Sequence, residues 1–313
     1  MDQSIPAAYV EYRGMETKPD DFDTFWLSQK EEVERATLHV QLELQETVVF
    51  QGKKVYRIQF QALDKTPIIG WYICGETRHK QCLLTTHGYR SQKKSPHEYL
   101  HWVDAGVDVL AFDMRLQGGE TGCMTPLDGP FKEVIALNIL YLPKSYLLMV
   151  YQDMMLASRL PEWLGYEGYV LEGTSQAGGL SMATACLMQT ATAVMINVPS
   201  NSDLDERVRQ SAGSFKAFQM LCNRDAETYE KVCHHLSYFD TKNMAERMNA
   251  PLFASVGGMD TVCPAQAFFA TYNRIKSEKH ITYYPFSGHE GGGEAHTEKE
   301  IQFLQSLLKR KEL

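Results

Sequence analysis

The chain has 313 residues, a formal net charge of -8 and a sequence pI near 5.7. This acidic balance, without long basic clusters, argues against nucleic-acid binding. No stretch approaches the roughly 18 consecutive apolar residues that a membrane span needs, and the hydrophobic fraction of 44% is typical of a globular protein.

No secretory signal is predicted at the amino terminus. Residues 1–6 contain neither a basic nor an apolar region of the secretory kind. The seven cysteines include no CxxC pair, which favours reduced thiols over a disulfide framework. We therefore expect a cytoplasmic protein, in which a catalytic role for Cys123 or Cys263 is possible but packing thiols are commoner.

The first 80 residues indicate a helix followed by antiparallel strands. Residues 18–36 have the apolar spacing of an amphipathic helix. Residues 54–63 and 67–74 alternate with period two, which predicts a hairpin or meander.

The remaining sequence, residues 81–313, alternates short apolar strands with helices. Strands are predicted at 82–86, 108–112, 169–172, 193–198, 252–256 and 280–284, and helices at 96–105, 144–164, 180–190 and 297–308. This alternation predicts an α/β fold with a mostly parallel central sheet flanked by helices. We expect one domain over 1–313, with functional residues at the carboxyl ends of strands.

The strongest chemical signal is the run from Gly173 to Ala177, with Ser175 at its centre. A serine between a strand and a helix, flanked by small residues, is typical of the exposed nucleophile of an α/β-hydrolase. The usual pattern ends in glycine, and Ala177 is a small replacement. A glycine-rich helix start with an incidental serine is the less favoured interpretation.

The fold predicts an acid and a histidine after the serine, in that order. Asp260 follows the strand at 252–256, and His289 lies on a glycine-flanked loop after the strand at 280–284. An aspartate placed in this way can orient a histidine that acts as general base. Asp203 and Asp205 remain less favoured sources of the acid.

Other histidines late in the chain are weaker candidates for the base, namely His234, His235, His280 and His296. A metal site built from His289, His296 and the nearby glutamates lacks any recognisable zinc-ligand pattern. We therefore expect no metal and no cofactor. The oxyanion donors are expected to be the backbone N–H groups of Gln176 and Tyr89.

Several separated motifs resemble the acetyl xylan esterase and cephalosporin-C deacetylase family, carbohydrate esterase family seven. The matching segments are residues 21–26, 87–89, 113–119, 175–179, 238–240, 243–245, 255–257, 260, 263–264, 272–273 and 288–290. The resemblance implies a metal-independent serine esterase that removes acetyl groups from carbohydrates or from small substrates such as cephalosporin C. It also implies the triad Ser175, Asp260 and His289, supporting roles for Arg115 and Gln117, and assembly as a homo-oligomer, commonly a hexamer.

The sequence also departs from the family pattern. Leu116 and Ala177 replace glycines, residues 200–203 are polar where the family tends to be apolar, and residues 119–145, a possible insertion, are only loosely similar. Two other functions therefore stay open. One is hydrolysis of other small esters or acyl-peptides on the same fold, and the other is a catalytically silent binding protein.

Overall fold

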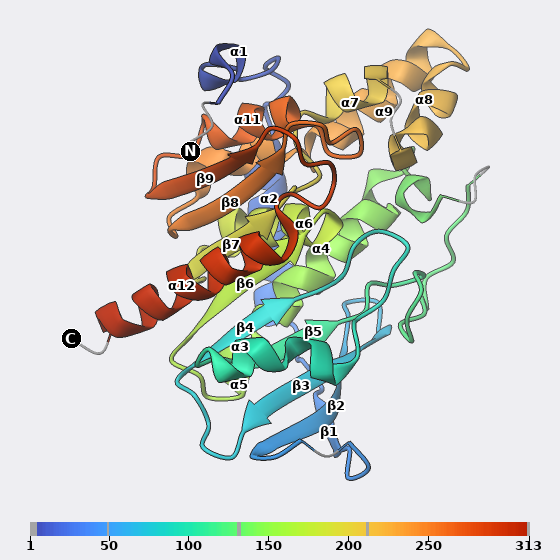
Figure 1. The fold of residues 1–313 in the computed structure, drawn as a ribbon. Helices are drawn as coiled ribbons and strands as arrows, with labels where there is room; N and C mark the ends of the chain where they lie inside the picture. The colour runs from blue at the N-terminus through green and yellow to red at the C-terminus, as the bar shows by residue number, and fades with distance from the viewer. Residues whose placement is uncertain (1–4, 49, 130–132, 211–212, 312–313) are drawn as a thin grey trace.

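A single mixed sheet organises the structure, a computed structural model that describes residues 5–48, 50–129, 133–210 and 213–311 (Figure 1). Within these residues the strands are ordered β1-β2-β3-β5-β4-β6-β7-β8-β9. Every pairing from β5 through β4 to β9 is parallel, whereas β1, β2 and β3 pair in antiparallel fashion. The predicted mostly parallel sheet with an antiparallel amino-terminal extension is confirmed.

The strands are β1 (Gln41–Leu44), β2 (Lys53–Gln61), β3 (Pro67–Gly75), β4 (Gln81–Thr85), β5 (Asp108–Phe112), β6 (Gly168–Thr174), β7 (Ala193–Asn197), β8 (Leu252–Gly257) and β9 (Lys279–Tyr284). The α-helices are α1 (Ala7–Val10), α2 (Phe22–Arg35), α3 (Leu100–Asp104), α4 (Tyr146–Ala157), α5 (Leu160–Trp163), α6 (Gln176–Met188), α7 (Leu204–Gln210), α8 (Lys216–Cys222), α9 (Ala226–Ser237), α10 (Thr241–Met244), α11 (Ala265–Tyr272) and α12 (Gly293–Lys311). Short 3₁₀ segments are η1 (Pro96–Tyr99), η2 (Val134–Ala136), η3 (Leu142–Lys144), η4 (Gly213–Phe215) and η5 (Ala245–Arg247).

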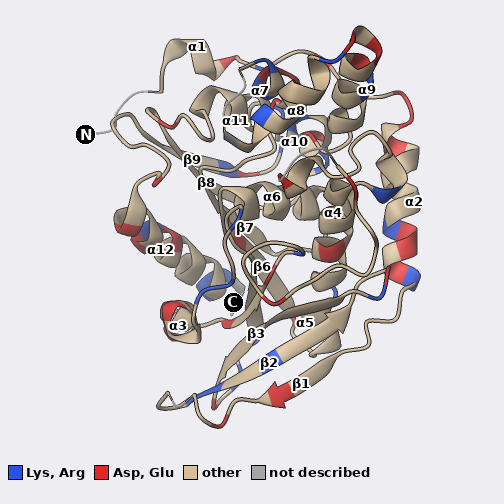
Figure 2. Cartoon of the chain, turned by 90° about the vertical axis from the view of Figure 1, so that its right-hand side faces the viewer, with Lys and Arg blue, Asp and Glu red and all other residues tan. Residues whose placement is uncertain are grey.

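Helices cover both faces of the sheet. Helices α3 and α12 lie on one face, and α2, α4 and α6 lie on the other (Figure 2). The two hydrophobic cores follow this division, because Trp102 and Leu304 belong to one cluster while Trp26, Met154 and Met182 belong to the other. Strands β4 and β5 are buried along their whole length, which explains the apolar residues at the centre of β4 and over 109–112 of β5.

Several predicted boundaries were wrong. The helix predicted over 144–164 is divided into α4 and α5, and Pro161 lies in the first turn of α5, where its missing N–H costs no hydrogen bond. The helix predicted to begin at residue 180 begins at Gln176. Strand β1 and helices α1, α7, α8, α10 and α11 were not predicted. Residues 119–145 contain the 3₁₀ segments η2 and η3 among their described residues, and 130–132 lie outside the described part of the chain.

No helix in the described ranges combines the length and the apolar character that crossing a bilayer requires.

The carboxy-terminal helix α12 buries a histidine against the sheet. His296 is 1% exposed and stacks on Phe253 of β8 with ring centroids 5.4 Å apart. Burial, assisted by the charge of Lys299, lowers the pKa of His296 to about 4. Burial and the charge of Glu172 raise the pKa of Glu300, whose carboxyl lies 3.8 Å from the imidazole. His296 is therefore neutral near pH 7, and its contact with Glu300 is not an ion pair.

The lowered pKa of His296 predicts an acid-sensitive fold. The unfolded chain binds this proton near pH 6.5 and the folded chain only near pH 4, so the stabilising contribution is complete above pH 6.5 and is lost as the pH falls toward 4. In wild type, His296 should lower the free energy of unfolding by up to about 3 kcal/mol between pH 7 and pH 4, and His296→Phe should remove this decrease. Denaturant unfolding at pH 7, 5.5 and 4 measures the effect. His280→Phe, at an exposed histidine, is the control. If the free energy of unfolding changed with pH equally in His296→Phe and in wild type, the role of His296 would be contradicted.

Candidate active site

Ser175 lies on a sharp turn between β6 and α6. Its backbone has φ 60° and ψ -119°, a left-handed conformation that L-residues rarely adopt. Its N–H donates to Asn197 O at 2.9 Å and its C=O accepts from Ser200 N–H at 3.0 Å, so the end of β7 holds the turn on both sides. A side chain at Gly173 would lie 2.4 Å from the carbonyl carbon of Ala177. The glycine therefore creates the space in which Ala177 fits.

Ser175, His289 and Asp260 form a continuous hydrogen-bonded chain. His289 Nε2 lies 2.9 Å from Ser175 Oγ, and His289 Nδ1 lies 2.8 Å from Asp260 Oδ2. The other carboxylate oxygen accepts from the backbone N–H groups of Val262 at 2.7 Å and Cys263 at 2.9 Å. Since an ionised carboxylate only accepts, Nδ1 carries the proton and Nε2 is free to accept from the serine. The structure thus brings together the three residues that were predicted from three distant segments.

Close backbone packing positions the two loops that carry the acid and the histidine. A side chain at Gly257, the last residue of β8, would lie 2.1 Å from Gly288 O, so the loops can approach only because residue 257 is glycine. Asn197 Nδ2 donates to Glu290 O at 3.0 Å and ties the histidine loop to β7. Asp260 has a fully buried side chain, whereas the His289 side chain is 34% exposed.

The backbone N–H groups of Tyr89 and Gln176 make no hydrogen bond to a described residue, and both residues line the cavity that contains Ser175. Gln117 links the segments that carry them. Its side-chain oxygen accepts from Arg90 N–H at 2.7 Å, and its amide nitrogen lies 2.9 Å from Gln176 Oε1 and 2.8 Å from Tyr146 Oη. Free N–H groups held in this way can stabilise a negatively charged oxygen.

Arg115, two residues before Gln117, is held by two aspartates. It is 1% exposed and makes two 2.7 Å bonds to the carboxylate of Asp153, and a third bond reaches Asp64 at 2.9 Å. Its carbonyl accepts from Tyr146 Oη–H at 2.8 Å. A paired guanidinium with several hydrogen bonds can be buried without an uncompensated charge.

Leu116, between Arg115 and Gln117, has a positive φ of 56° and a side chain that is 39% exposed. Its N–H donates to Thr121 O at 3.0 Å. The turn therefore needs a left-handed residue, which glycine adopts without strain, and it accommodates leucine by directing the side chain toward solvent.

A cavity of about 540 Å³ opens beside Ser175 and His289. Its apolar wall contains Ile135, Leu147, Val150, Leu180, Phe215 and Val262, and its polar lining includes Lys94, Ser200, Asn201 and Arg207. Tyr89 also lines this cavity. Sequence reasoning missed Arg207 and Phe215, because no motif marks them and only the packing of α7 and η4 brings them to the cavity.

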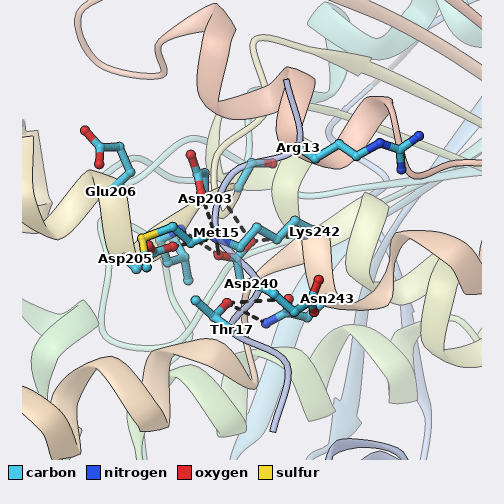
Figure 3. Close-up of polar contacts among 12 residues, drawn as sticks. Arg13, Met15, Thr17, Asp203, Asp205, Glu206, Asp240, Lys242 and Asn243 are labelled. Atoms are coloured by element: carbon cyan, nitrogen blue, oxygen red, sulfur yellow. Dashed lines mark hydrogen bonds and ion pairs between the residues drawn. The ribbon is translucent and has the colours of Figure 1, made fainter. Parts of the chain in front are cut away.

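Asp203 and Asp205, the alternative acids, do not reach the histidine. Figure 3 shows them with Asp240 around the ammonium group of Lys242. Lys242 Nζ lies 2.6 Å from Asp203 and 3.6 Å from Asp240, and it also bonds Asp205. The three carboxylates are close enough to one another to hold a metal ion, but the lysine already lies among them. The structure thus explains this acidic cluster as a buried ion-pair network.

The alternative bases are also remote from the serine. His235 Nδ1 contacts Ile139 O, His280 is exposed beside Glu278, and His296 is buried against Phe253. His234 packs edge-on against a tyrosine of the same segment.

Two cysteines lie close to functional side chains. Cys263 Sγ lies 4.0 Å from Ser175 Oγ. Burial raises the pKa of the Cys263 thiol, and the Arg207 guanidinium only partly opposes this shift, so the protonated form dominates. Cys123 contacts Arg115 and Thr125 O instead.

Comparison with known proteins identifies one consistent group. The family model for acetyl xylan esterase matches residues 7–307. Acetyl esterase Axe7A of Xylanibacter ruminicola is 25% identical over 314 residues, which cover 94% of this chain and 67% of that protein. An acetyl xylan esterase from Paenibacillus sp. R4 superposes with TM-score 0.92 at 28% identity, covering 97% of this chain and 99% of that one. Acetyl xylan esterase 1 from Thermoanaerobacterium sp. JW/SL YS485 superposes with TM-score 0.89 at 26% sequence identity, covering 97% of this chain and 99% of that one.

The backbone of Leu116 makes a specific prediction for stability. Leu116→Gly should raise the free energy of unfolding by up to about 1 kcal/mol, because glycine relieves the left-handed strain. Leu116→Val should lower it by about 1–2 kcal/mol, because a β-branched side chain fits this conformation worse. Denaturant unfolding of both variants measures the difference. A valine variant at least as stable as the glycine variant would contradict the strain argument.

Proposed function

We propose a mechanism for this chain from the premise that it belongs to the acetyl xylan esterase family. It is a carboxylic-ester hydrolase, and the family and its relatives support hydrolysis of acetyl esters of carbohydrates. In this proposal Ser175 is the nucleophile, His289 the general base and Asp260 the residue that orients the histidine. The observation that carries it is the hydrogen-bonded chain from Ser175 Oγ through His289 to Asp260.

The reaction would proceed in two steps. Ser175 Oγ attacks the ester carbonyl carbon while its proton moves to His289 Nε2. The carbon–oxygen bond to the alcohol then breaks, and His289 returns the proton to the leaving alcohol. In the second step water attacks the acetyl-serine, His289 takes its proton, and acetate leaves as Ser175 regains a proton.

The negative charge that develops on the carbonyl oxygen needs donors that are already in place. We assign this role to the backbone N–H groups of Tyr89 and Gln176. Gln117 is a positioning residue in this scheme, since it bonds both Arg90 N–H and the Gln176 side chain. Arg115 supports the same loop from beneath through Asp153.

The substrate proposed is a small acetylated carbohydrate or a comparable small ester such as cephalosporin C. The cavity of about 540 Å³ beside the serine supports a small molecule. Assembly as a homo-oligomer, commonly a hexamer, and a cytoplasmic location are proposals that rest on the family resemblance and on the cysteine pattern. One domain over 1–313 is proposed because the amino-terminal strands share the sheet of the catalytic core.

Replacing the nucleophile tests the mechanism. Ser175→Ala should lower kcat for acetyl-ester hydrolysis by at least about 10³-fold, because the remaining histidine and aspartate cannot form the acyl intermediate. Initial rates with 4-nitrophenyl acetate and with an acetylated xylo-oligosaccharide measure the loss. Unchanged circular dichroism would show that the variant is folded. Comparable rates for variant and wild type would exclude Ser175 as the nucleophile.

The linking role of Gln117 predicts an effect on turnover. Gln117→Leu should lower kcat by about 10- to 100-fold with a small change in KM, because the donor groups serve the transition state more than the bound substrate. The matched control is Gln152→Leu, since Gln152 pairs with Gln29 on α2. A raised KM with unchanged kcat would instead indicate that Gln117 contributes to substrate binding.

A further inference from the structure

Arg207 on α7 is a buried cation in the wall of the cavity that contains Ser175. It is 2% exposed and lines this cavity. One terminal nitrogen donates to Val262 O, and Nε has no hydrogen-bond partner. No carboxylate of the described residues lies within ion-pair distance of its guanidinium.

The guanidinium is held in a fixed place near the reacting groups. Its centre lies 4.5 Å from the centroid of the Phe215 ring, so one face is stacked on an aromatic surface. Arg207 also interacts with the thiol of Cys263, and Cys263 Sγ is 4.0 Å from Ser175 Oγ. The charge is therefore separated from the nucleophile by a single side chain.

The acids nearest to Arg207 in sequence are occupied by other groups, and Glu206, its direct neighbour, pairs with Arg209 at 2.9 Å. Asp203 accepts from Tyr12 Oη–H at 2.7 Å and from Lys242 Nζ at 2.6 Å. Asp205 accepts from Lys242 and, at 2.9 Å, from Arg209. These bonds place both carboxylates in the Lys242 cluster of Figure 3 rather than at Arg207.

The cavity itself supplies no counter-charge. Its described lining contains the cations Lys94 and Arg207 and no aspartate or glutamate. Asp260, the acid behind His289, has a fully buried side chain that bonds the histidine and two backbone N–H groups. Burying a guanidinium without a partner is unfavourable, and arginine does not relieve the cost by losing its proton. An anionic group of a ligand would complete this arrangement.

We propose that Arg207 binds a carboxylate of the substrate, and that the preferred substrate is an acetyl ester whose alcohol portion carries that carboxylate. This inference rests on the proposed function. Because an acetyl group has no charge, the carboxylate must belong to the alcohol portion, as in an acetylated sugar linked to a uronic acid. A planar guanidinium fixed by stacking is suited to recognition of a planar carboxylate.

The experiment compares 4-acetoxybenzoate with its uncharged methyl ester. Wild type should show a lower KM for the carboxylate, and absence of this preference would overturn the proposal without any variant. In Arg207→Met, kcat/KM for the carboxylate should fall about 10- to 100-fold more than kcat/KM for the methyl ester, the range expected for a charge-assisted hydrogen bond. Taking the ratio cancels the different reactivities of the two leaving groups.

Two further variants keep the test decisive. Arg207→Gln retains a donor for Val262 O but no charge, and it replaces Arg207→Met if that variant does not fold. It should lower the ratio of kcat/KM for the carboxylate to kcat/KM for the methyl ester. Arg209→Met removes a cation from the exposed side of the same helix and should leave the ratio unchanged. Equal losses for both substrates in the Arg207 variants, or an equal shift in Arg209→Met, would overturn the carboxylate site.

The outcome also separates this inference from the mechanism. Hydrolysis of the methyl ester that disappears in Ser175→Ala, without any carboxylate preference, would refute only the role of Arg207. Methyl-ester hydrolysis that persists in Ser175→Ala would refute the proposed mechanism instead.

Discussion

The left-handed backbone of Ser175 is the constraint on which the rest of the site depends. A residue in this conformation is strained unless its surroundings hold it, and here the end of β7 holds it through Asn197 and Ser200. The turn also brings the end of β6 close to the first residues of α6. This close approach is possible because Gly173 has no side chain. The sheet therefore holds Ser175 as a rigid projection, and the loops after β8 and β9 need only bring Asp260 and His289 to it.

Buried charge is a second organising feature. Arg115 is matched by Asp153 and Asp64, and the Lys242 ammonium is matched by a group of aspartates, so these cations tie distant segments together without an uncompensated charge. Arg207 differs from both, because within the described ranges it lies at a cavity and has no acid beside it. Arg115 and Lys242 therefore have counter-charges within the fold, whereas Arg207 has none among the described residues, which is the basis of its proposed role.

Much of the fold could be read from local pattern. The central strands β4 and β5 are buried along their whole length and so are mainly apolar in sequence. Strands β2 and β3 pair in antiparallel fashion, as their period-two pattern indicated. Helices α7, α8 and α10, between β7 and β8, escaped prediction because each has only four to seven residues and presents no long amphipathic stripe to the sheet (Figure 1). The division of α4 from α5 was missed although Pro161 marks it.

By itself, the sequence determined which residue types stand directly after which strands, and this order was enough to select Ser175, Asp260 and His289 as one candidate group. Chain order specifies these positions because the carboxyl ends of parallel strands meet at one edge of a sheet. Only the tertiary structure decided that Asp203 and Asp205 surround Lys242, and that Arg207 reaches the cavity. Those outcomes depend on how α7 packs against segments far away in the chain, and local sequence carries no record of such contacts.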